Sequence, residues 1–549
     1  MNGANALIKT LTASGIDTCF TNPGTSEMHF VAALDKSDMR AVLCLFEGVA
    51  TGAADGYARM ANKPAATLLH LGCGLGNGIA NLHNARKARV PMINIIGDHA
   101  LSHKQYDAPL QSDIETLAKN VSSWVRTSES TQKIGIDTAE AINNAQDAPQ
   151  QISTLILPAD VSWGKGGKYK KAFSKKESQP TEKSNIQKIA DIIKNRGKKT
   201  AIILGRRVLL EEGLIAASKI SERTGVKLFC EVFPTRLERG CGLPAVERIA
   251  YLSEMASVQL AGYKHIVLID AQAPVSFFAY PGKKSYLVPK SCEVLELVTA
   301  QQDAVASLKL LMQAVGAQNM RPKLQEAERP ELPTGNLTSA KVCQAVGALL
   351  PANSIISDEA QTSGLKLPFY TAGSPKHNLL TLTGGAIGQG LPVAIGASIA
   401  SDRPVISLVG DGSSMYTIQS LWTMVNENLD VTVVILNNRS YAILNMELER
   451  VGATGAGPKA KSQLDLSETQ IDFTAMAESM GMAAERVATA EDFNFALREA
   501  LKFKGPRLIE AIIPSEYEGL KLKALPYLLN TMEKVPSPLG KAIKKKLAP

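Results

Sequence analysis

Short apolar runs separated by segments of helical periodicity recur along the chain. Residues 41–46, 65–69 and 92–96 form such runs near the amino end, and residues 405–409 and 431–436 form two more near the carboxyl end. Runs of this length without polar alternation are typical of strands buried on both faces of a parallel sheet. The segments between them are long enough for crossover helices. The pattern predicts an α/β protein made of parallel sheets with flanking helices.

Two stretches of different composition interrupt this pattern. Residues 164–185 are rich in Lys, Ser and Gly, and residues 320–335 contain several prolines and many charges. Both are typical of boundaries between domains. The expected α/β domains span residues 1–165, 186–320 and 338–515, and a tail of unassigned role follows at residues 516–549.

The strand predicted at residues 405–409 runs into a Gly-Asp-Gly segment centred on Asp411, and the strand at 431–436 runs into Asn437-Asn438. Apolar residues at helical spacing lie between them, so both strand ends belong to one βαβ unit, where α/β sheets place their ligands. The glycines predict a tight turn that brings backbone N–H groups close to an anion. A carboxylate, an amide oxygen and a nearby carbonyl suit Mg²⁺, which also recruits phosphate oxygens. The structural alternative is a glycine turn followed by a polar strand end.

Composition excludes several classes of protein. The chain of 549 residues has a net charge of +8, and its pattern shows no single face that carries both the arginines and the stacking aromatics of a nucleic-acid surface. No apolar run reaches the roughly 18 residues of a membrane helix, and the first residues do not resemble a signal peptide. Seven scattered cysteines suit reduced core residues. These features predict a cytoplasmic protein that binds neither nucleic acid nor membrane.

Glu47 follows the predicted strand at 41–46 and opens a helix of small residues that ends in Gly-Tyr-Ala-Arg. A glutamate at this position is by default favourable for the helix dipole. The small residues predict that another element packs very close to this helix.

Together, the Gly-Asp-Gly and Asn-Asn segments and the Glu47 helix resemble those of thiamine-diphosphate-dependent enzymes. The resemblance covers nearly the whole chain and is strongest to the branch that contains benzoylformate decarboxylase and acetolactate synthase large subunits. It implies a pyrimidine-binding domain, a central domain and a diphosphate-binding domain, in that order. It also implies an enzyme that decarboxylates 2-oxo acids with thiamine diphosphate and Mg²⁺. The resulting enamine would be joined to an acceptor carbonyl, as in acetolactate synthase, or released as an aldehyde, as in benzoylformate decarboxylase.

The resemblance also implies roles for individual residues. In these enzymes a glutamate at the place of Glu47 hydrogen-bonds the aminopyrimidine and starts formation of the carbanion. His70 matches the first active-site histidine of benzoylformate decarboxylase, and Thr25, with Ser26 beside it, matches a catalytic serine. The Gly385 carbonyl would accept from the aminopyrimidine. The other implied residues are Ile387 as the wedge that bends the cofactor; Gln361, Thr362, Gly410, Gly412, Ser413 and Tyr416 around the diphosphate; and Asp411, Asn438 and the Ser440 carbonyl on Mg²⁺.

The same resemblance implies a homodimer or tetramer, because Glu47 and Asp411 lie on different domains that meet across a subunit interface in these enzymes. No fingerprint in the central domain demands FAD, so the presence of FAD stays open.

The sequence departs from the family pattern at two positions. Phe278 or Ala279 stands where benzoylformate decarboxylase has its second histidine, and Leu444 stands where pyruvate decarboxylases have an acid. Loss of these proton donors favours carboligation over aldehyde release. Gln111, preceded by Leu110, loosely matches a glutamine of acetolactate synthases and is expected to border the pocket.

Two other classes of protein compete with this interpretation. Residues 68–85 form a strand, a glycine loop and a helix, with Asp98 ending a later strand, which is similar to a dinucleotide fingerprint of an NAD-binding oxidoreductase. The third glycine of that fingerprint is missing. A non-catalytic homologue used only in assembly is the other alternative, and the intact Glu47, Asp411 and Asn438 argue against it.

Overall fold

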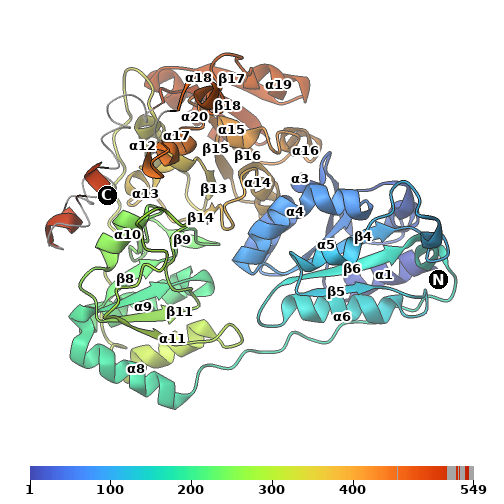
Figure 1. The fold of residues 1–549 in the computed structure, drawn as a ribbon, viewed down its shortest axis with the longest axis horizontal. Helices are drawn as coiled ribbons and strands as arrows, with labels where there is room; N and C mark the ends of the chain where they lie inside the picture. Colours follow the sequence, from blue (N-terminus) through green and yellow to red (C-terminus); the bar gives the residue numbers. More distant parts are fainter. Residues whose placement is uncertain (454–455, 516–526, 530, 532–537, 543–549) are drawn as a thin grey trace.

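The computed structural model describes residues 1–453, 456–515, 527–529, 531 and 538–542, and most of the predicted tail lies outside them (Figure 1). The described chain forms three mainly parallel sheets flanked by helices, which confirms the predicted fold class. In Figure 1 the first sheet lies at the right, the third at the top and the central sheet at the lower left. No helix among the described residues combines the length and apolar character needed to cross a membrane.

The first sheet is parallel throughout, in the order β2-β1-β3-β4-β6-β5. Its strands are β1 (Thr18–Asn22), β2 (Arg40–Leu43), β3 (Ala65–Leu69), β4 (Met92–Asp98), β5 (Trp124–Thr127) and β6 (Ile152–Pro158). Its main helices are α1 (Gly3–Ala13), α3 (Glu47–Ala61), α4 (Leu71–Ala88), α5 (Ile114–Lys119) and α6 (Ile134–Gln146). Strand β2 is shorter than the predicted 41–46, so Glu47 is reached through three residues that lie outside the strand.

The central sheet is also parallel, in the order β10-β8-β7-β11-β12. Its strands are β7 (Thr200–Leu204), β8 (Lys227–Cys230), β10 (Glu247–Arg248), β11 (His265–Ile269) and β12 (Glu293–Glu296). Helices α8 (Lys183–Arg196), α9 (Glu211–Thr224), α10 (Ser253–Leu260) and α11 (Ala304–Ala314) accompany it. The connection that follows the first sheet runs along the outside of the molecule to α8 (Figure 1).

The third sheet has the order β17-β18-β16-β15-β13-β14-β9. Its parallel strands are β13 (Ile355–Glu359), β14 (His377–Thr381), β15 (Val405–Gly410), β16 (Val431–Asn437), β17 (Ala483–Val487) and β18 (Arg507–Ile512). Helices α12 (Ser339–Leu349), α14 (Gly390–Ile399), α15 (Asp411–Ser414), α16 (Ser420–Asn426), α17 (Ala442–Arg450), α19 (Phe473–Ser479) and α20 (Ala490–Lys502) flank them.

One edge of the third sheet is supplied by the middle of the chain. Strand β9 (Leu237–Arg239) pairs antiparallel with β14, with Leu237 opposite Leu379 and Arg239 opposite His377. Sequence reasoning placed residues 237–239 in the central domain and did not anticipate this pairing. A three-residue strand carries too short a pattern to reveal its partner.

Helices α3 and α14 join the first and third sheets in very close contact, as the small residues of α3 predicted. A Cβ added to Gly56 would lie 2.2 Å from the Val393 carbonyl oxygen, and one added to Gly396 would lie 1.8 Å from the Ala53 carbonyl oxygen. Backbone therefore touches backbone across this contact. The contact brings the segment that begins at Glu47 beside the segment that precedes α14.

Candidate active site

Asp411 and Asn438 come together at the carboxyl ends of β15 and β16, which are neighbours in the third sheet. The Asp411 carboxylate accepts from the Gly412 N–H at 2.8 Å and from the Arg439 N–H at 2.6 Å. Burial raises the pKa of Asp411 to about 6, although backbone N–H groups act in the opposite direction. A buried carboxylate with this pKa is a site where a cation would be stabilising.

The Gly-Asp-Gly segment does not form the predicted tight turn. Strand β15 ends at Gly410 and α15 begins at the next residue, and neither Gly410 nor Gly412 has a positive φ. Gly412 serves a different purpose, because a Cβ there would lie 2.4 Å from the Tyr441 ring. The sharp turn occurs instead at Arg439, whose φ of 56° directs its N–H toward Asp411.

The donors at this edge match those that Mg²⁺ takes in proteins. They are the Asp411 carboxylate, the Asn438 side-chain carbonyl and the backbone carbonyl of Ser440, all oxygen ligands. The Asn438 Oδ1 accepts from the Ser440 N–H at 3.0 Å, so this amide lies on the same short loop. The donor chemistry and the buried Asp411 carboxylate fit a divalent cation.

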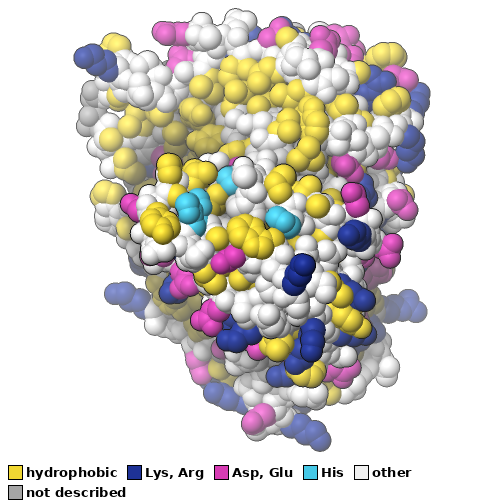
Figure 2. All heavy atoms as spheres, turned by 90° about the vertical axis from the view of Figure 1, so that its right-hand side faces the viewer, with side chains coloured by type: hydrophobic (Ala, Val, Ile, Leu, Met, Phe, Trp, Pro, Cys, Tyr) yellow, Lys and Arg dark blue, Asp and Glu magenta, His cyan; other side chains and the backbone are white. Residues whose placement is uncertain are grey.

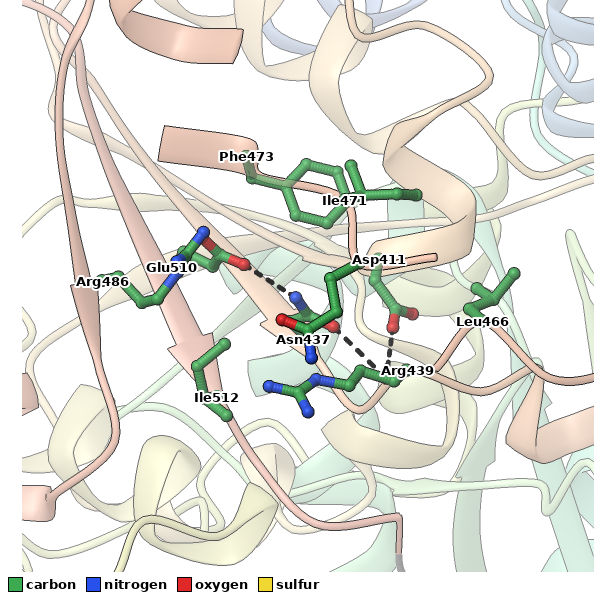
Figure 3. A pocket seen from close by; sticks show the side chains of 10 residues that line it. Asp411, Asn437, Arg439, Leu466, Ile471, Phe473, Arg486, Glu510 and Ile512 are labelled. Carbon is green, nitrogen blue, oxygen red and sulfur yellow. Dashed lines mark hydrogen bonds and ion pairs between the residues drawn. The ribbon is translucent and has the colours of Figure 1, made fainter. Parts of the chain in front are cut away.

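A polar chain behind Asp411 holds the loop that follows β16 (Figure 3). The Asn437 side chain donates to Glu510 at 2.7 Å, and its oxygen accepts from the Arg439 N–H at 3.3 Å. Glu510, which is fully buried, also accepts from Arg486 at 2.8 Å. These groups line a cavity of about 40 Å³ that reaches Asp411. Sequence reasoning identified Asn437 only as part of a motif, and Glu510 and Arg486 were missed.

The residues expected around the diphosphate occupy neighbouring strand ends of the third sheet. Gln361 and Thr362 begin the turn after β13, next to β15, and Gln361 has a positive φ of 51°. Ser413 is buried in α15, whereas Tyr416 is 53% exposed. These residues therefore border one end of the sheet, with Tyr416 open to solvent.

Residues 383–389 form a glycine-rich loop between β14 and α14, and α4 of the first domain holds it. Asn84 donates to the Ala386 carbonyl at 2.8 Å and accepts from the Ala386 N–H at 3.1 Å. His83 Nε2 lies 3.2 Å from the Gly384 carbonyl. Gly385 has a φ of 80°, and a Cβ there would lie 2.4 Å from the Phe277 ring. The loop is thus fixed before Ile387 by groups from two other domains.

Glu47 opens α3 and its carboxyl group turns toward α4. It accepts from the Asn77 side chain at 3.0 Å, and a Cβ on Gly74 would lie 2.9 Å from its Oε1. Glu47 is only 7% exposed. Asn81, one turn further along α4, donates to the Gly48 carbonyl at 2.8 Å and to the Gly388 carbonyl at 3.1 Å. Helix α4 therefore contacts both Glu47 and the glycine-rich loop.

The asparagines of α4 were missed by sequence reasoning. Asn77, Asn81 and Asn84 stand at positions i, i+4 and i+7 and so share one face of the helix. An amide stripe of this spacing inside an otherwise apolar and glycine-rich segment is the signal that could have identified them.

His70 lies at the carboxyl edge of the first sheet, against the turn that follows β1. Its Nδ1 is 2.8 Å from Glu27 Oε2 and 3.3 Å from Ser26 Oγ. Ser26 also donates to Glu27 Oε1 at 2.5 Å, and the Gly24 N–H donates to Glu27 Oε2 at 2.7 Å. Thr25 is exposed, so Ser26 is the hydroxyl that contacts His70 in this conformation.

Glu27 is the residue that sequence reasoning overlooked at this edge. It is fully buried, and a Cβ on Gly97 of β4 would lie 1.4 Å from its Oε1. The local sequence signal is the spacing of three residues between Gly24 and Glu27, which lets the Glu27 side chain accept from the Gly24 N–H. Leu71, directly after His70, has a φ of 52°, which is a strained conformation for leucine.

The weakly predicted pocket residues lie in different surroundings. Leu110, Phe278 and Leu444 are 42%, 58% and 45% exposed, and Gln111 is half-buried. Phe278 packs against Phe277 with ring centroids 5.3 Å apart. Phe277, which was not predicted, is the ring that reaches Gly385.

The dinucleotide alternative loses its structural basis. The glycines expected in a loop after β3 lie inside α4, which begins at Leu71. Asp98, the candidate acidic residue, pairs with Lys104 and accepts from the His99 N–H. No glycine loop separates the strand from the helix, which adds to the missing third glycine as an argument against this alternative.

Comparisons with known proteins agree with this geometry. The family described as "Thiamine pyrophosphate enzyme, N-terminal TPP binding domain" matches residues 1–120. The family of the corresponding C-terminal TPP binding domain matches residues 361–511. The acetolactate synthase large subunit-like protein IlvX of Mycobacterium tuberculosis is 53% identical over 518 residues, which cover 94% of this chain and 99% of that protein.

More distant relatives extend the match. Benzoylformate decarboxylase of Pseudomonas aeruginosa is 27% identical, with 92% of this chain and 98% of the relative covered. The solved structure of a thiamine diphosphate-dependent 4-hydroxybenzoylformate decarboxylase from Rhodococcus jostii RHA1 superposes with a TM-score of 0.82 at 24% identity, over 94% of this chain and all of that one. The chain therefore belongs to the thiamine pyrophosphate enzymes and carries their two cofactor-binding domains.

Proposed function

We propose that this protein is a thiamine-diphosphate- and Mg²⁺-dependent enzyme that decarboxylates a 2-oxo acid and joins the remaining fragment to an acceptor carbonyl. The observation that carries the proposal is the double role of α4. One face of this helix binds the Glu47 carboxyl through Asn77 and the glycine-rich loop through Asn81 and Asn84. Helix α4 thus fixes the two groups that one chain would contribute to the two aminopyrimidine sites of a dimer.

The residues of this chain would bind the cofactor at both ends. When bound, thiamine diphosphate supplies a carbanion nucleophile and accepts the electron pair that decarboxylation leaves behind. Asp411, Asn438 and the Ser440 carbonyl would hold Mg²⁺, with Gln361, Thr362 and Ser413 near the diphosphate. The Gly385 carbonyl would accept from the exocyclic amine, and Ile387 would bend the cofactor. Glu47 would exchange a proton with a ring nitrogen of the pyrimidine.

His70, with Glu27 and Ser26, would orient the substrate carboxylate and move protons at the reacting carbon. Hydrogen bonding to Glu27 fixes the orientation of the imidazole, which is the role of a buried carboxylate beside a catalytic histidine. Phe278 and Leu444 supply no proton at the positions where relatives carry one, and this supports carboligation. The His70–Glu27 pair supports a second candidate, release of an aldehyde, because it could protonate the same carbon.

Product identification tests both candidates. The purified protein, thiamine diphosphate and Mg²⁺ are incubated with a panel of 2-oxo acids, and the products are separated and identified. We expect products in which the fragment left after decarboxylation is joined to an acceptor carbonyl, namely acyloins or condensation products that carry a 2-hydroxy-2-methyl group. Aldehydes as the main product would favour the second candidate, and no CO₂ release from any 2-oxo acid would contradict the proposal.

We further propose a homodimer in which Glu47 of one subunit meets Asp411 of the other. Exposed hydrophobic side chains border both predicted half-sites: Leu43 and Leu45 precede Glu47, and Tyr416 follows Asp411. Figure 2 shows hydrophobic side chains gathered over the upper part of the face that includes the first domain, with basic side chains below. Apolar surface of this kind marks an interaction site.

Mixing two inactive variants tests this arrangement. If the site is shared, a mixture of Glu47→Ala and Asp411→Ala chains forms mixed dimers with one intact site, and activity returns to about a quarter of wild type. A site closed within one chain would leave the mixture inactive.

All seven cysteines are free, which supports a cytoplasmic location.

A further inference from the structure

Glu359 is a fully buried carboxyl group to which the proposed mechanism gives no role. It ends β13, directly before the turn that holds Gln361. Its Oε1 accepts from the Gly388 N–H at 2.7 Å, and its Oε2 accepts from the Gly390 N–H at 2.6 Å. Gly388 belongs to the glycine-rich loop, and Gly390 is the first residue of α14. Each oxygen of this carboxyl group therefore has its own backbone donor.

The surroundings leave Glu359 little freedom to move. A Cβ on Gly390 would lie 2.8 Å from the Glu359 Cβ, so only glycine permits this approach. Gly388 has a φ of 93°, a conformation that side chains rarely adopt, and its carbonyl accepts from Asn81 and from Thr417 at 3.0 Å. Gly388 is thus held at its N–H by Glu359 and at its carbonyl by Asn81 of α4 and by Thr417.

We infer that Glu359 is a positioning residue that, when ionised, holds the glycine-rich loop in the conformation that binds the aminopyrimidine. The inference rests on the proposed function of that loop. A carboxylate can accept from both N–H groups at once. A neutral carboxylic acid can accept well from only one of them, because its hydroxyl must itself donate. Protonation of Glu359 would release one end of the loop, one residue after Ile387.

The charged groups around this site are few. Asp358 precedes Glu359 on β13, and its own charged neighbours are Arg248 and Arg239. On the loop side, Gln389 donates to Asp55 at 2.6 Å, and Asp55 is paired with Arg59 on α3. On the adjacent strand, Val409 lies opposite Glu359.

Burial raises the pKa of Glu359 to about 7, against the effect of the backbone N–H groups. The ionised form is therefore lost as the pH falls through about 7. We expect the affinity for thiamine diphosphate to weaken over the same range. The fold responds in the opposite direction, because a raised carboxyl pKa means that the folded state binds the proton more tightly. This contribution to stability is complete below the ordinary pKa and is lost as the pH rises toward 7.

The test compares Glu359→Gln with a matched control, Glu231→Gln. Glu231 is a half-buried glutamate after a strand of the central sheet, and burial likewise raises its pKa to about 7, but it does not contact the glycine-rich loop. Affinity for thiamine diphosphate is measured by fluorescence quenching at saturating Mg²⁺, at pH 8 and pH 5.5. Any pH dependence of this affinity that arises from the Mg²⁺ ligands or from His70 is common to all the proteins compared, so it does not affect the comparison.

At pH 8 we expect Glu359→Gln to bind thiamine diphosphate roughly tenfold more weakly than wild type, the loss of one hydrogen bond to a charged group. At pH 5.5 the two affinities should converge, because wild-type Glu359 is then neutral. The control should match wild type at both pH values. Equal affinities at pH 8, or the same deficit at both pH values, would overturn the inference.

Glu359→Asp provides a second variant if the glutamine variant does not fold. It keeps two acceptors on a shorter side chain, so it should bind more weakly than wild type at pH 8 and approach wild type at pH 5.5. Wild-type affinity throughout would overturn the inference. Failure of wild type to bind thiamine diphosphate at all would instead contradict the proposed function, so the two failures are distinguishable.

Discussion

At the carboxyl edge of the first sheet, Glu27 is held mainly by side chains, those of His70 and Ser26. At the carboxyl edge of the third sheet, Glu359 and Asp411 are held by backbone N–H groups, and burial raises the pKa of both. Side chains with exchangeable protons suit proton movement, whereas rows of backbone donors suit the fixed binding of a charged ligand. Two sheets of the same architecture are thus equipped for different tasks.

The largest effect should come from the first domain. We expect Glu47→Ala to reduce turnover by roughly 10³-fold, the middle of the range for loss of an acid–base group. Affinity for thiamine diphosphate should change little, because the third domain supplies the diphosphate and metal contacts. Steady-state kinetics and fluorescence titration measure the two quantities. Glu115→Ala, an exposed position of the same domain, is the control, and wild-type turnover in the Glu47 variant would contradict the assignment.

The third domain should show the opposite pattern. We expect Asp411→Ala to weaken retention of Mg²⁺ and thiamine diphosphate by about 10²-fold, since an ionised ligand is removed. Dialysis followed by metal and cofactor analysis reports the loss. Asp430→Ala lies at the other end of β16, where Asp430 pairs with Lys504, and should behave as wild type. Equal retention of Mg²⁺ and thiamine diphosphate in both variants would contradict a metal site at this edge.

Glu27 tests whether the side-chain network at the first edge acts as a unit. We expect Glu27→Gln to reduce kcat by about tenfold, because His70 loses the carboxylate that orients it. A double variant with His70→Ala should cost no more than His70→Ala alone. The pH profile of kcat should also shift in Glu27→Gln. Additive losses in the double variant would show that the two residues act separately.

A separate effect, on stability rather than on activity, concerns the third domain. Burial lowers the pKa of His377 on β14 to about 3, so the folded protein keeps this imidazole neutral. Stability from His377 is complete above its ordinary pKa of 6.5 and is lost as the pH falls below that value. Between pH 6.5 and 5 the loss is roughly 2 kcal/mol. Denaturant unfolding of wild type and His377→Gln at both pH values isolates this loss, because the carboxyl groups with raised pKa values are common to both proteins. The difference in unfolding free energy between the two should change by this amount, and a difference that is independent of pH would contradict the prediction.

The two edges also differ in how far the sequence revealed them. Strands buried on both faces have an unmistakable composition, so the positions of Asp411 and Asn438 at neighbouring strand ends followed from the pattern alone. Glu27 and Glu359 did not, because their roles depend on which distant backbone or ring they meet. The same applies to Asn81, whose two acceptors lie 33 and 307 residues away along the chain.

The turns predicted at glycines were wrong for a related reason. The sequence predicts that they form turns, yet Gly412 accommodates the Tyr441 ring, and the glycines after His70 lie within a helix. A glycine is required wherever another group approaches closely, and sequence does not distinguish that requirement from a turn. Close approach becomes visible only once the neighbouring element is in place.

Strand β9 has a consequence for dissecting the molecule. Because this segment of the middle of the chain covers the outer edge of β14, excising residues 186–320 would leave the β14 hydrogen-bonding groups uncovered. Bare edges of this kind invite pairing with other chains. Shortened versions that join the two cofactor-binding halves directly are therefore expected to aggregate unless three residues equivalent to 237–239 are retained.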